Sequence, residues 1–83
     1  SDLRLIEAGR LAERLLGDAI FANMIVLGAA WQSGALPLTR AAIEGAIALN
    51  GAAVAANARA FAIGRWAAVD GAAALRAAGQ AAA

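Results

Sequence analysis

Side chains that could do acid–base or metal chemistry are few in this 83-residue chain, and they do not gather in the sequence. Histidine and cysteine are both absent, which excludes a zinc site, a thiolate nucleophile and histidine-dependent proton transfer within the chain. The acidic residues are Asp2, Glu7, Glu13, Asp18, Glu44 and Asp70. Because these lack the close spacing of a carboxylate metal site, we assign no catalytic, cofactor-binding or metal-binding residue.

Two tryptophans and two asparagines are the other candidates for binding. Trp31 and Trp66 could stack on a ligand, but tryptophans on apolar helical stripes are more often core or interface anchors. Asn23 lies in an apolar stretch, where its amide either fixes the helix register through a hydrogen bond or offers a polar handle to a ligand. The same two interpretations stay open for Asn57, which lies beside Arg59.

Charge and composition restrict the class of protein. Seven arginines against six acidic residues give a net charge of +1, and the arginines are scattered, so the sequence indicates no nucleic-acid-binding face. Alanine supplies 28 residues, and only 24 residues carry large apolar side chains. Alanine favours helix but buries little apolar area. We therefore expect a strongly helical chain with a thin core.

Hydrophobic periodicity predicts an all-α fold of four helices, at about 3–16, 19–32, 40–49 and 52–70 or beyond. The second helix carries no charged residue, so it must be covered by protein or by lipid. Its 14 residues are fewer than the about 20 that a membrane span needs. We therefore expect it to be the buried central helix of the fold, and we expect no membrane association.

Local signals mark the helix ends. Gly17 is placed to end the first helix and Asp18 to cap the second, because glycine tolerates a left-handed backbone and a carboxylate accepts from free amides. Thr39 is placed to cap the third helix, with Leu38 and Ile43 flanking it as a hydrophobic staple.

The later helices have predicted core faces. The third is expected to expose an Arg40–Glu44 pair and to bury Ile43, Ala46, Ile47 and Leu49. The fourth has an apolar stripe of Val54, Ala58, Phe61 and Ala62, continued by Ile63, Trp66 and Val69. Gly64 within it would allow another helix to approach closely. Residues 71–83 are mostly alanine with one leucine. Alanine favours continued helix, but one leucine is little to pack with, so we expect a helical tail that frays.

Three blocks of sequence point to a family when they are read together: "LLGDAIFANMIVLGAAWQSGALPLT", "AIEGAIALNGAAVAANARAFAIGR" and "WAAVD". In this order they resemble the C-terminal part of the gamma domain of 2-oxoacid:ferredoxin oxidoreductases, most closely the large fused indolepyruvate ferredoxin oxidoreductases of bacteria. The similarity covers about residues 11–70, and the order of the blocks is more specific than any one block. It implies that residues 1–70 are the helical end of an α/β domain whose sheet lies upstream.

The resemblance implies an enzyme that oxidatively decarboxylates an aryl 2-oxoacid such as indolepyruvate to an acyl-CoA and reduces ferredoxin. Thiamine diphosphate, Mg²⁺ and iron–sulfur clusters would be its cofactors. No catalytic residue of the family matches a position here, so we expect a packing and interdomain segment that is inactive alone. The alternative is a free-standing helical oligomerisation or protein-interaction module.

Partners and location follow as expectations. The partners would be the other domains of the enzyme, or a second copy of the chain. A homo-oligomer is expected through the second and fourth helices, with Trp31, Phe61 and Trp66 as interface anchors. Because the sequence opens without a signal-peptide pattern, we expect a cytoplasmic protein.

Overall fold

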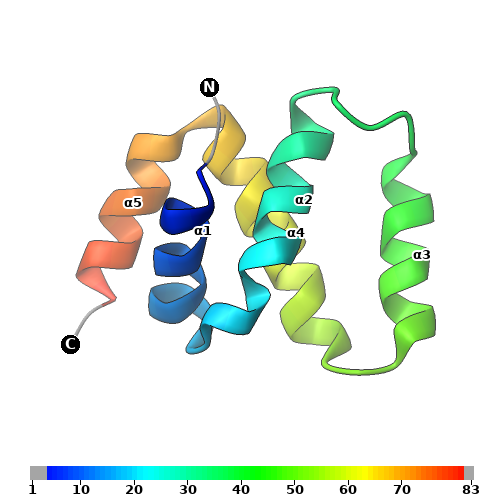
Figure 1. Ribbon diagram of the computed structural model, residues 1–83, viewed down its shortest axis with the longest axis horizontal. Helices are drawn as coiled ribbons and strands as arrows, with labels where there is room; N and C mark the ends of the chain where they lie inside the picture. The colour runs from blue at the N-terminus through cyan, green and yellow to red at the C-terminus, as the bar shows by residue number, and fades with distance from the viewer. Residues whose placement is uncertain (1–3, 82–83) are drawn as a thin grey trace.

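A computed structural model describes residues 4–81, which are helical with short connections and contain no strand (Figure 1). The elements are α1 (Leu5–Leu11) with a π-helical turn η1 (Ala12–Leu16), a 3₁₀ turn η2 (Ala19–Phe21) with α2 (Ala22–Gln32), α3 (Arg40–Asn50), α4 (Val54–Val69) and α5 (Gly71–Gln80). The predicted all-α fold is confirmed. The predicted set of four helices is incomplete, because α5 is a fifth helix.

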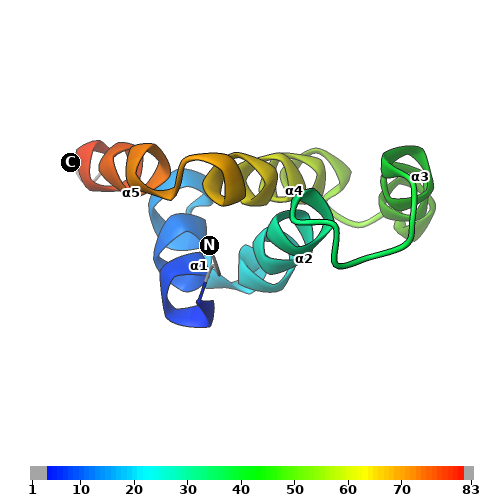
Figure 2. The same cartoon turned by 90° about the horizontal axis from the view of Figure 1, so that it is seen from above.

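The helices form a flat molecule of 34 × 27 × 16 Å. Figure 2 shows α5 and α4 following one another along one edge, with α1 and α2 beside them and α3 at the opposite end from α5. The most extensive contact between helices joins α2 to α4. Along the shortest axis α4 and α5 form one layer and α1 and α2 the other (Figure 2), so each of these helices keeps a side near solvent.

The predicted helix ends are confirmed. Gly17 ends the first helical segment with φ of 83°, and the Asp18 carboxylate accepts a hydrogen bond from the Ile20 amide at 3.0 Å. The Thr39 hydroxyl oxygen accepts from the Ala42 amide at 3.1 Å. Each end depends on one residue, either a glycine with a left-handed backbone or a side chain that accepts a hydrogen bond. Such residues can be recognised directly in the sequence.

Two glycines allow α2 and α4 to meet at the backbone. A β-carbon added to Gly64 would overlap the carbonyl oxygen of Ile25 and lie 2.8 Å from the amide nitrogen of Ala29. A β-carbon on Gly28 would overlap the carbonyl oxygen of Phe61. The expected close approach at Gly64 is therefore confirmed, and Gly28 supplies the matching gap on the other helix.

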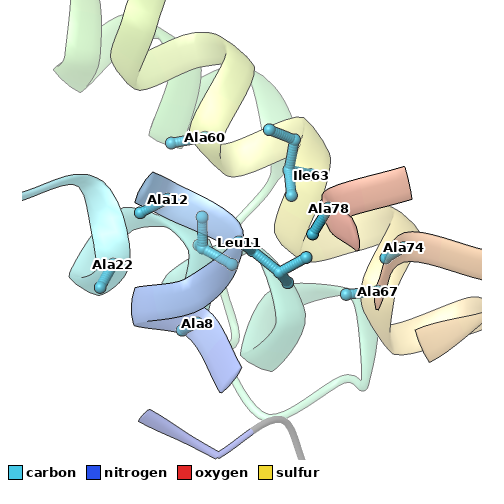
Figure 3. Packing of buried hydrophobic residues seen from close by; sticks show 10 residues of the cluster. Ala8, Leu11, Ala12, Ala22, Ala60, Ile63, Ala67, Ala74 and Ala78 are labelled. Atoms are coloured by element: carbon cyan, nitrogen blue, oxygen red, sulfur yellow. The ribbon is translucent and has the colours of Figure 1, made fainter. Parts of the chain in front are cut away.

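Alanine builds the larger of two core clusters. Figure 3 shows Leu11 at its centre, surrounded by residues of α1, α2, α4 and α5. Its buried members are Ala8, Leu11, Ala12, Ala22, Ile25, Ala60, Ile63, Ala67, Ala74 and Ala78. Small side chains let the four helices approach Leu11, Ile25 and Ile63 closely, so little apolar volume fills this core.

The tail beyond residue 70 is helical as α5 through Gln80, so the expected helix is present over this range. The Asp70 carboxylate caps it by accepting from the Ala73 amide at 3.1 Å, and Ala74 and Ala78 are fully buried. This cap and the packing of the two alanines against α1 and α4 stabilise α5, although it has only one large apolar side chain. The end of the predicted tail, residues 82–83, lies outside the described residues.

A smaller core cluster attaches α3. Ile43 and Ile47 are buried with Phe61, and Met24, Leu27 and Trp31 pack against them. The predicted burial of Ala46 and Leu49 is wrong: both are exposed, and Leu49 keeps 91% of its surface accessible. Two isoleucines one turn apart determine which side of α3 faces the protein, and the other two residues lie off that line.

The second helix is central but not enclosed. Its buried residues are Ala22, Ile25, Gly28 and Ala29. Asn23 is exposed, so the expectation of a buried amide that needs a partner is wrong. Ile20, in the preceding turn, is 73% exposed. The thin shape of the molecule is the reason, since neighbours cover only part of this helix.

The predicted apolar stripe of the fourth helix is rotated in the structure. Helix α4 buries Ala60, Phe61, Ile63, Gly64 and Ala67, while the predicted Val54, Ala58, Ala62, Trp66 and Val69 are exposed. The tight crossing at Gly64 fixes this rotation. In α1, Leu5 and Ile6 are exposed because the neighbouring helices reach only its later turns. Among the described helices, none is long and apolar enough to span a membrane.

Candidate binding surfaces

The acidic side chains serve helix ends and surface pairs. In residues 4–81 no three acidic residues gather where they could hold a metal ion. Asp18 and Asp70 are caps, and Glu7 accepts from the Arg4 amide at 3.2 Å. Glu44 lies 3.8 Å from the guanidinium of Arg40, which confirms the predicted pair. Glu13 is exposed, and the remaining acid, Asp2, lies outside the described residues.

Trp31 is held in place by three neighbours. Its indole N–H donates to the carbonyl of Leu38 at 2.7 Å, and its ring meets that of Phe61 with centroids 6.0 Å apart. The guanidinium of Arg65 lies 5.3 Å from the centroid of the Trp31 ring and donates to the amide oxygen of Gln32 at 3.1 Å. This tryptophan is therefore a structural anchor, as tryptophans on apolar stripes usually are.

An apolar groove lies between α2, α3 and α4, with a volume of about 510 Å³. We call it the α3 groove. Its lining includes Met24 and Leu27 of α2, Leu38 of the loop, Ala42 and Ala46 of α3, and Asn57 of α4. The Asn57 amide donates to the Ala52 carbonyl at 3.1 Å, which ties it to the start of its own helix. With no charged side chain in its lining, the groove suits an apolar group.

The outward half of α3 continues this apolar surface. We call it the α3 outer face: Ala41, Ala42, Gly45, Ala46, Ala48 and Leu49. At 100° per residue these positions fall within one half of the helix circumference, and all six are exposed. The helix's two charged residues, Arg40 and Glu44, lie outside this half. A helix side that faces water normally carries polar residues, so this one has the composition of a covered surface.

A second apolar exposure lies at the end of α4. Trp66 is 40% exposed and Val69 is 72% exposed. With Gln32, Ala62 and Arg65 they border a shallow hollow, and we call these five residues the Trp66 surface. A tryptophan beside an arginine is a common composition of protein-binding surfaces. Phe61, predicted as a third interface anchor, is buried inside the chain, so its ring is not available to a partner.

Comparisons of the chain with models of protein families, with curated proteins and with solved structures find no match. Function therefore has to be argued from what the described residues do. The sequence reasoning missed both the α3 groove and the α3 outer face, because it assigned Ala46 and Leu49 to the core. The sequence feature that could have indicated them is the uncharged run of alanines around Leu49 on α3.

Proposed function

We propose that this chain is a helical packing segment of a 2-oxoacid:ferredoxin oxidoreductase of the indolepyruvate type. It would join other parts of the enzyme and would be inactive by itself. Thiamine diphosphate, Mg²⁺ and the iron–sulfur clusters would be bound by those other parts, since an iron–sulfur cluster needs cysteine thiolates and this chain has no cysteine. The resemblance of its sequence blocks supports the enzyme class, and the roles of their residues support the packing role.

One observation carries the packing role: residues that stand out in the resembling blocks make structural contacts. They end or cap helices or form the α2–α4 crossing, namely Gly17, Asp18, Gly28, Thr39, Gly51 and Gly64. Trp31 and Arg65, in the same blocks, stack on each other beside that crossing. Residues that shape and join helices are what a packing segment requires.

The Trp66 surface would be the contact with the rest of the enzyme. Its tryptophan offers a large, rigid apolar group, while Arg65 is held at its edge by the amide of Gln32. Burial of such an anchor supplies much of the affinity of an interface. A Trp66→Glu variant should therefore lose association with the enzyme while it keeps its fold.

The native gene and a binding assay test this proposal together. A reading frame that continues well beyond both ends and encodes CxxC clusters and a thiamine diphosphate motif supports it. The upstream portion, produced separately, should then co-elute with the chain. The Trp66→Glu variant should lose this co-elution, whereas Ile6→Glu, the same kind of change at a site on α1 that is 86% exposed, should keep it. A start codon near Ser1 and a stop codon after Ala83 would contradict the enzyme assignment.

A free-standing interaction module is the second candidate, favoured by the self-contained core. Leu11, Ile25 and Phe61 are enclosed by the chain's own helices, and no buried side-chain polar atom of the described residues lacks a hydrogen-bond partner. A short reading frame that encodes little more than this chain would select the module over the enzyme segment.

A further inference from the structure

We infer that the α3 groove binds a small uncharged molecule that is mostly aromatic or aliphatic and carries one hydrogen-bond donor. The apolar part of the molecule lies along α3, and its donor meets the side-chain oxygen of Asn57. The inference goes beyond the packing role in an enzyme and does not require it. It concerns the groove between α2, α3 and α4, and it is independent of what covers the outward side of α3.

The groove has the size of a small-molecule site. Its volume of about 510 Å³ lies within the range of about 300–1,000 Å³ that such sites have. Helices α2, α3 and α4 and the loop before α3 all contribute to its walls, so the groove contacts an occupant from several sides. Eight residues line it, whereas a standard protein interface uses about 20–30 residues on each side. The groove is therefore large enough to hold a small molecule, but a protein contact needs a much larger surface.

The lining determines the chemistry of the molecule. Seven of the eight lining residues are apolar, and the eighth is Asn57. A charged group placed between these walls would lose water without gaining an ionic partner, which is costly, so the groove selects against buried charge. An apolar group gains free energy when the same walls take it out of water. One amide among apolar side chains is the usual pattern of a site in which a single polar contact orients the ligand.

Asn57 supplies that polar contact, and its orientation is fixed before a ligand arrives. The side-chain nitrogen donates to the Ala52 carbonyl at 3.1 Å. Because a carbonyl only accepts, the amide nitrogen has to face Ala52 and the amide oxygen has to face away from it. This oxygen is an acceptor at the groove, so it matches a ligand that carries an O–H or N–H. Binding then costs little side-chain ordering at this contact.

Helix α3 is the most weakly attached wall of the groove. Ile43 and Ile47 hold it to the smaller core cluster, and it has much less contact with α4 than α2 has. Figure 1 shows α3 at one end of the molecule, with the other helices on one side of it only. Few buried contacts make local opening easy, so α3 can separate while the other helices stay folded. A molecule in the groove contacts α3 together with α2 and α4, so it should hold α3 in place.

A titration with 1-naphthol tests the site, followed by the amide NMR signals of the isotope-labelled chain. This probe is an uncharged aromatic molecule with one O–H donor. We expect saturation at one molecule per chain, with a dissociation constant of about 30–300 µM.

A matched pair of variants places the probe in the groove. Ala46→Phe puts a large side chain into the groove and should raise the dissociation constant at least about 10-fold. Ala48→Phe makes the same change at a position of α3 outside the lining and should leave the constant unchanged. Both alanines are exposed, so both variants should keep the helical circular dichroism of the parent.

The hydrogen bond to Asn57 is tested by a matched pair of probes. 1-Methylnaphthalene has a methyl group where 1-naphthol has its O–H, so it occupies the same space but cannot donate. The ratio of the two dissociation constants should change by about 3- to 10-fold between the parent and Asn57→Ala, in the direction that removes the advantage of 1-naphthol. Because both probes meet the same variant, the ratio cancels any general effect of the substitution on the groove.

Hydrogen exchange tests the effect on α3. In the free chain the amides of α3 should exchange faster than those of α2 and α4. With 1-naphthol at three times the dissociation constant of the parent, exchange of the α3 amides should slow by about 4-fold. The same probe concentration should slow it by less than about 1.5-fold in Ala46→Phe, because little of that variant is bound.

Several results would overturn the inference. One is a folded parent chain whose signals do not saturate with 1-naphthol up to about 1 mM. Others are equal weakening by Ala46→Phe and Ala48→Phe, or a probe ratio that Asn57→Ala leaves unchanged. An affinity for 1-naphthol that falls as the chain concentration rises would show that a second copy occupies the groove instead. None of these results depends on the enzyme assignment, because they leave the Trp66 surface and the reading frame untouched.

Discussion

Gly28 of α2 and Gly64 of α4 face each other's helix so closely that neither position has room for a β-carbon. The carbonyl oxygens of Phe61 and Ile25 occupy the two places where those β-carbons would lie. Because backbone atoms occupy the space, no rotation of a side chain can make room. The two helices that support both core clusters are therefore positioned by the absence of side chains.

Replacing either glycine by alanine should separate these helices. We expect Gly64→Ala and Gly28→Ala each to lower the free energy of unfolding by about 3 kcal/mol, the upper part of the usual range for overpacking. Gly45→Ala is the control: it lies on the exposed side of α3 and should raise stability by about 0.5–1 kcal/mol through helix propensity. Urea unfolding followed by circular dichroism measures all three. If Gly28→Ala and Gly64→Ala are as stable as the parent, α2 and α4 are farther apart at this crossing than the structure shows.

The cap of α3 should be measurable separately. Thr39→Ala removes the acceptor of the Ala42 amide and should cost about 0.5–2 kcal/mol, whereas Thr39→Ser keeps an oxygen there and should cost less than half as much. Thermal melts of the two variants under one condition give the comparison. Identical melting temperatures for alanine and serine would show that the hydroxyl does not support the helix.

Leu11 should be the most sensitive single side chain of the larger core cluster. It is fully buried in a cluster in which seven of the ten buried members are alanines, and alanines have no flexible side chains to fill a vacancy. We expect Leu11→Ala to cost about 3–5 kcal/mol, the range in which a site relaxes poorly. Ile6→Ala on the exposed side of the same helix should change stability by less than about 0.5 kcal/mol. Denaturant melts with similar losses for both would contradict the described core.

Features that depend on local chemistry, such as helix caps, could be predicted from the sequence. The side of each helix that is buried could not, because it depends on the neighbouring helices. Asp18 and Thr39 cap the helices they were expected to cap, because a cap involves only the next turn of the chain. Ala46 and Leu49 were placed in the core, yet they are exposed. An alanine is compatible with either side of a helix, and with 28 alanines the periodicity leaves the rotation of each helix open.

The candidate surfaces were less predictable than the helices. The α3 groove combines side chains from α2, α3, α4 and a loop, and its existence depends on how far α3 stands from its neighbours. No spacing within one segment encodes that distance. The structural role of Trp31 was predictable as a type, but its partners were not: Arg65 and Leu38 reach it from different parts of the chain.

The last prediction concerns α5, which lies in the tail that the sequence analysis expected to fray. Ala74 and Ala78 are fully buried against the cluster around Leu11, and Leu75 packs at its edge. A chain that ends after Asp70 would expose this side of the core, so we expect it to lose about 2 kcal/mol of stability, which lowers the melting temperature by roughly 10 °C. A chain that ends after Gln80 keeps all of α5 and should melt like the parent. Thermal melts by circular dichroism separate the two cases, since helix lost only from a frayed tail would lower the signal without moving the midpoint. An unchanged midpoint after removal of 71–83 would show that α1, α2 and α4 close the core without α5.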